Sequence, residues 1–143
     1  MTRDDIIAEA REWIGTPWIH QASCKGAGAD CIGLIAGVAA ACGSPEAARF
    51  LSTPNWRNYG RNPDPAFMYS VCDDLMNRVP VANMRLADVL VFRCGKHPMH
   101  FGLATYAGKM IHAWLKARMV REHELDAGWR SEIVRVYRMR GIA

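Results

Sequence analysis

The sequence predicts a single α+β domain in which helices come first and an antiparallel sheet follows. Two observations support this fold class: hydrophobic residues recur at helical spacing in the first half of the chain, and after Pro80 they alternate or form short β-branched runs. The chain has 143 residues, of which half are hydrophobic and 22% are charged. That composition suits one hydrophobic core, so residues 1–143 are expected to form one domain.

The first helix should begin at Thr2 and Asp5, which have the spacing of a capping box. Gly15-Thr16-Pro17 should end it, and residues 15–29 have no hydrophobic period and are expected to form a loop. The apolar face of this helix would consist of Ile6, Ile7, Ala10, Trp13 and Ile14.

A second helix is expected from Asp30 or Cys31 to Cys42, ended by Gly43-Ser44-Pro45. Gly33 and Gly37 lie inside it, and each glycine costs about 1 kcal/mol relative to alanine in a helix. Close packing against another element would offset this cost. The second helix is therefore expected to be buried at the centre of the domain.

The remaining elements follow from caps, prolines and strand-like runs. Residues 50–63 are expected to form a long ordered loop, and Asp64-Pro65 should start a third helix that reaches about Arg78. Strands are then expected at 88–92, at 100–106 and 109–115 as a hairpin around Ala107-Gly108, and at 133–138.

One of the five cysteines stands apart by its position. The number of cysteines is odd and no CxxC pair occurs, so a disulfide framework or a zinc ribbon is disfavoured. Cys42 and Cys72 lie among apolar residues and are expected to be core residues. Cys31 follows the capping residue Asp30 at a helix start, where the helix dipole lowers a thiol pKa. Cys31 is therefore the predicted nucleophile. The cysteines are Cys24, Cys31, Cys42, Cys72 and Cys94.

A cysteine hydrolase also needs an imidazole beside the sulfur and a group that orients it. His100 and His112 lie on the two strands of the predicted hairpin. A two-residue turn would pair Leu103 with His112 and place the two histidines on opposite faces. A bulge or an odd-length turn is therefore predicted. The candidate bases are His20, His97, His100, His112 and His123.

Five short motifs, in order, resemble those of the NlpC-type cell-wall cysteine peptidases, which read roughly GTPY, DCSGL, GDLVFF, HVGI and IHA. The resemblance spans about residues 13 to 114. It implies a papain-like fold in which Cys31 is the nucleophile, His100 the general base and acid, and His112 the group that orients His100. No metal or cofactor is implied. The motifs here are Gly15-Thr16-Pro17-Trp18, Asp30-Cys31-Ile32-Gly33-Leu34, Ala87-Asp88-Val89-Leu90-Val91-Phe92, His100-Phe101-Gly102-Leu103 and Ile111-His112-Ala113.

The resemblance further implies an endopeptidase that hydrolyses peptidoglycan stem peptides, often at the γ-D-glutamyl to diamino-acid bond. Trp18, His20 and Asp30 are expected to line the substrate site. Trp18 replaces a common tyrosine and Ile32 a common serine. The stretch Trp18-Ile19-His20-Gln21, the Ile32 replacement and the short chain without a signal resemble the subgroup that phages, prophages and gene transfer agents encode. That likeness implies a tail component that opens the wall for DNA delivery and contacts tail hub or baseplate proteins. The chain would be made in the cytoplasm without a signal peptide and would act in the wall or periplasm.

Three other functions are compatible with the same residues. Cys94, His97, His100 and His112 could form a tetrahedral metal site. The chain could also be an inactive structural or adaptor subunit of a tail assembly, or an amidase or acyltransferase on the same fold.

The net charge of +4 predicts a solvated basic face, or more weakly affinity for an anionic surface, and no nucleic-acid-binding motif or membrane-spanning run occurs. The arginines concentrated near the end of the chain are Arg118, Arg121, Arg130, Arg135, Arg138 and Arg140.

Overall fold

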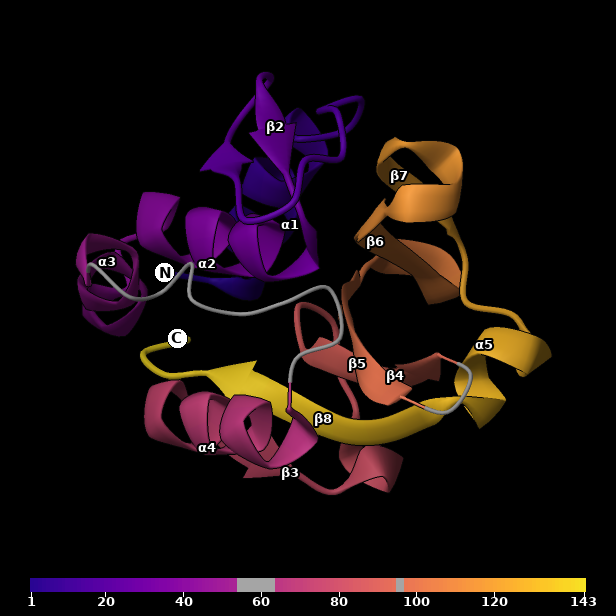
Figure 1. The fold of residues 1–143 in the computed structure, drawn as a ribbon. Coiled ribbons are helices and arrows are strands. Elements are labelled where there is room, and N and C mark those ends of the chain that lie inside the picture. Colours follow the sequence, from indigo (N-terminus) through magenta and orange to yellow (C-terminus); the bar gives the residue numbers. More distant parts are fainter. Residues whose placement is uncertain (54–63, 95–96) are drawn as a thin grey trace.

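The computed structural model describes residues 1–53, 64–94 and 97–143, except for the side chains of Cys94, His97 and Pro98. The chain combines helices with an antiparallel sheet (Figure 1), which confirms the predicted α+β class. The helices are α1 (Arg3–Glu12), α2 (Cys31–Ala41), α3 (Pro45–Ser52), α4 (Pro65–Leu75) and α5 (Ala127–Ser131). The strands are β1 (Ser23–Cys24), β2 (Gly28–Ala29), β3 (Met76–Val79), β4 (Val89–Cys94), β5 (His97–Ala104), β6 (Lys109–Trp114), β7 (Met119–Glu124) and β8 (Ile133–Met139).

Helix α1 begins with the predicted capping box. The Thr2 hydroxyl accepts a hydrogen bond from the Asp5 amide at 3.1 Å, and the Asp5 carboxylate accepts one from the Thr2 amide at 2.8 Å. Ile14 was expected on the buried face, but it is 44% exposed, so that prediction is wrong. The helix ends two residues before Ile14, and Gly15 follows with a φ of +88°, which turns the chain away.

Helix α2 is buried over residues 32–39, as predicted. A Cβ added at Gly33 would lie 1.8 Å from the Ala22 carbonyl oxygen, and one at Gly37 would lie 2.4 Å from the Trp13 ring. Both glycines therefore allow a close approach that no larger residue would permit. In Figure 1 the C-terminal end of α2 leads into α3, while its N-terminal end, at Cys31, lies toward β5 and β6.

Helix α3 was not predicted, because Gly43-Ser44-Pro45 was interpreted only as a stop signal. The Ser44 hydroxyl accepts a hydrogen bond from the Ala47 amide at 3.1 Å, and Pro45 occupies the first turn. The same residues therefore end α2 and start α3. The predicted loop at 50–63 is wrong at 50–52, and 54–63 lie outside the described residues.

The third predicted helix, α4, starts at Asp64-Pro65 as expected but ends at Leu75 instead of Arg78. The chain continues directly into β3, which pairs with β8. Residues 76–78, which were predicted to be helical, therefore belong to the sheet. Strand β7 and the short β1–β2 pair were also not predicted.

The larger sheet has the strand order β3-β8-β4-β5-β6-β7, with every pair antiparallel. Helix α2 packs against β5 and β6. The main hydrophobic cluster fills the space between the first helices and the sheet, and a second cluster forms around Leu90, Phe92, Met110 and Val136. The strands that carry the candidate histidines therefore lie next to the nucleophile helix.

The carboxylate of Asp88 is fully buried and joins three parts of the chain. It accepts two hydrogen bonds from Arg138 at 2.8 Å each and forms a 3.2 Å ion pair with Arg3. These bonds hold the start of β4 to α1 and to β8.

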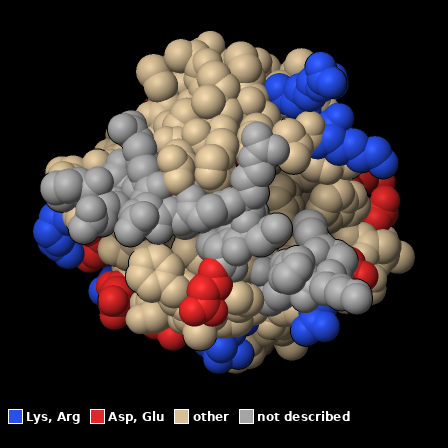
Figure 2. Space-filling view, viewed as in Figure 1, with Lys and Arg blue, Asp and Glu red and all other residues tan. Residues whose placement is uncertain are grey.

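Several of the C-terminal arginines have partners inside the domain. The side chains of Arg130, Arg135, Arg138 and Arg140 all donate hydrogen bonds within the chain. On the face drawn in Figure 2, basic side chains lie around the rim, including a group over the edge that carries β6 and β7. Among the described residues, no helix is long and apolar enough to cross a bilayer.

Candidate active site

Cys31 is the first residue of α2, directly after its cap. One oxygen of the buried Asp30 carboxylate accepts a hydrogen bond from the Gly33 amide at 2.8 Å, and the other accepts one from the Gln21 amide at 2.7 Å. Asp30 therefore starts the helix and ties the preceding loop to it. The amides of a first helical turn have no acceptor within the helix, so they can stabilise a negative charge beside Cys31.

The described cysteines differ in exposure: Cys31 and Cys42 are partly exposed, and only Cys31 stands at the start of a helix. Cys72 is buried, and burial raises the pKa of its thiol to about 12. Burial also raises the pKa of the Cys42 thiol. Both thiols stay protonated at neutral pH. Cys72 is a core residue, as predicted, whereas Cys42 is only partly buried and packs against the core. Cys24 is exposed on the short strand β1.

The β5–β6 hairpin has the odd-length turn that the sequence analysis required. Leu103 pairs with Ile111, and the strands are joined through the three-residue turn 106–108. This register places His100 and His112 on the same face of the sheet, because side chains two residues apart along a strand point the same way. The prediction of an odd-length turn is confirmed.

Strand β5 is also irregular just before His100. Phe92 pairs with His100, whereas Arg93 pairs with Pro98, which leaves Met99 as an extra residue with a φ of +139°. Such a bulge bends a strand and changes the direction of its next side chain. The irregularity therefore determines where the His100 imidazole points.

Three histidines form a hydrogen-bonded series across β5, β6 and β7. His100 Nε2 lies 2.5 Å from His112 Nδ1, and His112 Nε2 lies 2.7 Å from His123 Nε2. His123 Nδ1 lies 2.8 Å from the Glu124 carbonyl oxygen, which can only accept a hydrogen bond. This carbonyl fixes the proton positions of three neutral rings.

The tautomers follow step by step from that carbonyl. His123 donates through Nδ1, so its Nε2 accepts from His112 Nε2–H. His112 Nδ1 then accepts from His100 Nε2–H. The result is a His100 ring whose Nδ1 is unprotonated and able to take a proton.

Aromatic side chains enclose the three histidines. The ring centroid of Trp129 lies 5.1 Å from that of His112, Trp114 stacks on His112 at 5.3 Å, and Phe92 lies 6.0 Å from His100. Burial in this surrounding, followed by the charge of the nearby His123, lowers the pKa of His100 to about 4. Burial, followed by the charges of His100 and His123, lowers the pKa of His112 to about 2.

Sequence reasoning included His123 among the possible bases but gave it no role. Its strand, β7, is short and carries arginine and glutamate residues, so it lacks a hydrophobic alternation. The pairing of β6 with β7 brings His123 diagonally next to His112. Only that register identifies His123 as part of the series.

Trp18 and His20 lie in the loop before α2, with ring centroids 6.2 Å apart and nearly parallel. His20 Nδ1 is 3.9 Å from an oxygen of Asp30. The three residues expected to line the substrate site are thus close together beside the cap of α2. Their contact with substrate stays a prediction.

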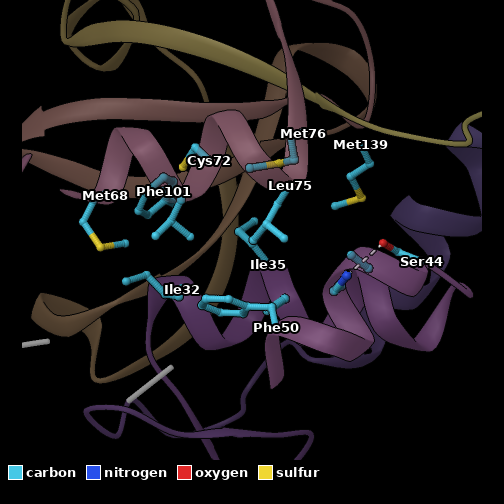
Figure 3. A pocket seen from close by; sticks show the side chains of 14 residues that line it. Ile32, Ile35, Ser44, Phe50, Met68, Cys72, Leu75, Met76, Phe101 and Met139 are labelled. Carbon is cyan, nitrogen blue, oxygen red and sulfur yellow. Dashed lines mark hydrogen bonds between the residues drawn. The ribbon is translucent and has the colours of Figure 1, made fainter. Parts of the chain in front are cut away.

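The residues that follow Cys31 and His100 in the chain line one apolar pocket. Figure 3 shows Ile32 of α2 on one side of this pocket and Phe101 of β5 on the other side, beside Met68 and Cys72 of α4. Helix α2 packs against β5 at this pocket.

The histidine series is built from hydrogen bonds and lacks a common point for a metal. His112 directs its two ring nitrogens at two different partners, so the three rings do not converge on one ion. Within 1–53, 64–94 and 97–143, no cluster of metal-ligating side chains of the kind zinc requires was found. The alternative metal site also involves Cys94 and His97, whose side chains lie outside the described residues.

The chain is similar to solved structures of NlpC/p60 proteins, two of which are named peptidoglycan hydrolases. The NlpC/p60 domain of the peptidoglycan hydrolase SagA has a TM-score of 0.64 and 19% identity, and the match covers 97% of this chain and all of that domain. An NlpC/P60 family protein from Bacillus cereus has a TM-score of 0.69 and 20% identity, over 97% of this chain and 40% of that one. The peptidoglycan hydrolase RipB from Mycobacterium tuberculosis has a TM-score of 0.60 and 20% identity, over 95% and 63% respectively.

The chain therefore has the NlpC/p60 papain-like fold. No protein-family model and no curated protein sequence matches it. At 20% identity or less, the three solved structures define the fold alone.

Proposed function

We propose that this protein is a cysteine endopeptidase that hydrolyses peptidoglycan stem peptides, with Cys31 as nucleophile. The observation that carries the proposal is the 2.5 Å contact between His100 and His112, on strands that pack against the helix that Cys31 begins. A nucleophile, a base and a group that orients the base are the minimum set for this chemistry. The SagA and RipB structures are those of peptidoglycan hydrolases, which supports the substrate class.

The proposed reaction begins with proton transfer from the Cys31 thiol to Nδ1 of the neutral His100. The sulfur attacks the amide carbonyl of the substrate, and the amide N–H of Cys31 stabilises the oxyanion. The His100 imidazolium gives its proton to the leaving amine as the C–N bond breaks. A water molecule, deprotonated by His100, then hydrolyses the thioester and restores the thiol.

The role of His112 in this scheme is to hold His100 in one orientation. Because burial disfavours the charged form, His112 stays neutral and its Nδ1 accepts from His100 Nε2–H before and after His100 becomes a cation. His112 therefore orients the base without competing for the proton. Its loss should reduce turnover, whereas loss of Cys31 should abolish it.

Two finer parts of the function belong to the same proposal. The bond is the γ-D-glutamyl to diamino-acid linkage, and the protein acts as a tail component that opens the wall for DNA delivery. The residues Trp18 and Ile32, in which this chain resembles the phage and gene-transfer-agent subgroup, support the second part. Detection of the chain in purified tail particles by mass spectrometry would test it, and its absence from such particles would oppose it.

The proposal is tested by digesting purified muropeptides and identifying the fragments by mass spectrometry. The wild type should release new amine and carboxyl termini at one stem-peptide bond, and Cys31→Ala should release none. Cys24→Ala, which removes an exposed thiol elsewhere, should cut like the wild type. Identical fragment patterns for the wild type and Cys31→Ala would rule out the peptidase.

A further inference from the structure

We infer that His123 is a positioning residue, which sets the tautomer of His112 and through it the proton-accepting state of His100. This inference deepens the proposed function and rests on Cys31 and His100 as the reacting pair. It assigns a role to a histidine outside the nucleophile, base and orienting group. The observation behind it is that the series of rings ends at a backbone carbonyl and not at His112.

A histidine is ambiguous as an orienting group, because either ring nitrogen can carry the proton. If His112 carried its proton on Nδ1, that N–H would point at His100 Nε2 and force the proton of His100 onto Nδ1. His100 could then take no proton from Cys31. The 2.7 Å contact between His112 Nε2 and His123 Nε2 excludes this arrangement when His123 presents a lone pair there.

His123 presents that lone pair on Nε2 because its Nδ1 carries the proton of the ring. Its Nδ1 donates to the Glu124 carbonyl at 2.8 Å, in the same strand, so the ring is held by its own backbone. The ring also packs against Trp129 at 5.5 Å and Trp114 at 5.4 Å. Strand β7 thus supplies an acceptor of fixed direction to the buried His112.

Two substitutions separate this role from a purely structural one. His123→Leu places an apolar side chain against Trp114 and Trp129 but removes the nitrogen that accepts a hydrogen bond from His112. In His123→Gln the side-chain carbonyl oxygen can take the position of Nε2 and accept from His112. If the function of His123 is lost in His123→Leu and recovered in His123→Gln, it depends on the hydrogen bond to His112 more than on the size of the side chain.

The first readout is the tautomer of His112 by nitrogen-15 NMR, which needs no substrate. In the wild type His112 should be protonated on Nε2, and His123→Gln should keep that state. His123→Leu should shift the population toward protonation on Nδ1. A wild-type His112 that is protonated on Nδ1 would overturn the inference.

The second readout is the rate at which iodoacetamide alkylates Cys31, measured by mass spectrometry of the digested protein. His123→Leu should slow the reaction by up to about tenfold, the order expected for the loss of one hydrogen bond between neutral groups. His123→Gln should recover most of the rate, and Cys24 provides a reference thiol in the same sample. An unchanged Cys31 rate in His123→Leu would overturn the inference.

These measurements distinguish failure of the inference from failure of the proposed function. If the wild type does not cut muropeptides, the proposed substrate is wrong, yet the tautomer of His112 still decides the role of His123. If the wild type cuts and His123→Leu keeps both the tautomer and the alkylation rate, the function stands and the positioning role is rejected.

Discussion

Trp129 covers His112 edge-on, with ring centroids 5.1 Å apart and an interplanar angle of 78°. The same indole lies 6.1 Å from His100 and 5.5 Å from His123, so one side chain touches every member of the histidine series. The backbone amide of Trp129 donates to the Asp126 carboxylate at 3.0 Å, which caps α5. The short helix α5 thereby carries the indole that lies against the three histidines.

Replacing Trp129 with alanine should raise the pKa of His100 from about 4 toward its ordinary value of 6.5. Burial is the largest cause of the lowered pKa, and removal of the indole admits water to the ring. Proton NMR titration of the His100 ring would measure the shift. Phe67→Ala, at a residue that is 53% exposed, should leave the titration unchanged. The explanation by burial would be wrong if His100 titrated identically in Trp129→Ala and the wild type.

The free energy of unfolding should fall as the pH is lowered from 7 to 5. His100 and His112 have folded-state pKa values below the ordinary value of 6.5, so between pH 6.5 and 4 the unfolded chain binds more protons than the folded one. Each histidine should contribute a slope of up to about 1.4 kcal/mol per pH unit in that range. Urea titrations at several pH values would measure it.

The control for this slope is a substitution outside the histidine series. Phe67→Ala, at an exposed position, should keep the pH dependence, whereas His112→Gln should make it shallower because one of the two buried rings is gone. A slope that is the same in all three proteins would show that the two buried rings do not cause it.

Gly33→Ala should destabilise the fold more than Gly37→Ala. The new Cβ at position 33 would meet the backbone carbonyl oxygen of Ala22 at 1.8 Å, whereas at position 37 it would meet the Trp13 side chain at 2.4 Å, and a side chain shifts more easily than the backbone. We expect a loss of about 3 kcal/mol or more for Gly33→Ala and about half of that for Gly37→Ala. Thermal unfolding monitored by circular dichroism would give the order, and the reverse order would contradict this account of α2 packing.

Asp88→Asn should destabilise the domain by about 3–5 kcal/mol, because it leaves Arg138 and Arg3 without their buried anionic partner. Asp74→Asn, at an exposed position of α4, should change the stability by less than about 0.5 kcal/mol. If the two variants unfolded at the same urea concentration, the buried carboxylate of Asp88 would contribute little to the stability of the fold.

The sequence predicted best those features that depend on neighbouring residues. The capping box at Thr2 and the cap at Asp30 involve residues three apart, so the pattern in the chain is also the contact in space. The small residues of α2 likewise predicted its close packing. The placement of Cys31 at a helix start followed from these local signals.

Features that depend on strand pairing could not be predicted from neighbouring residues. The position of His123 next to His112 results from the pairing of β6 with β7, and nothing within residues 119–124 indicates that register. Ser44-Pro45 shows a different limit, since the same residues that end one helix also cap the next. Both outcomes occur there, and α3 packs on α2.

The length of the turn at 106–108 has a consequence for how this hairpin can change over evolution. With three residues in the turn, Leu103 faces Ile111, and His112 emerges on the side of His100. Removing or adding one residue would rotate every side chain of β6 to the other side, so that Ile111 and Ala113 would replace His112 beside His100. Insertions or deletions of two residues at this turn should therefore be tolerated, whereas those of one residue should inactivate the protein. Evolution should then conserve whether the number of turn residues is odd or even, more than their sequence.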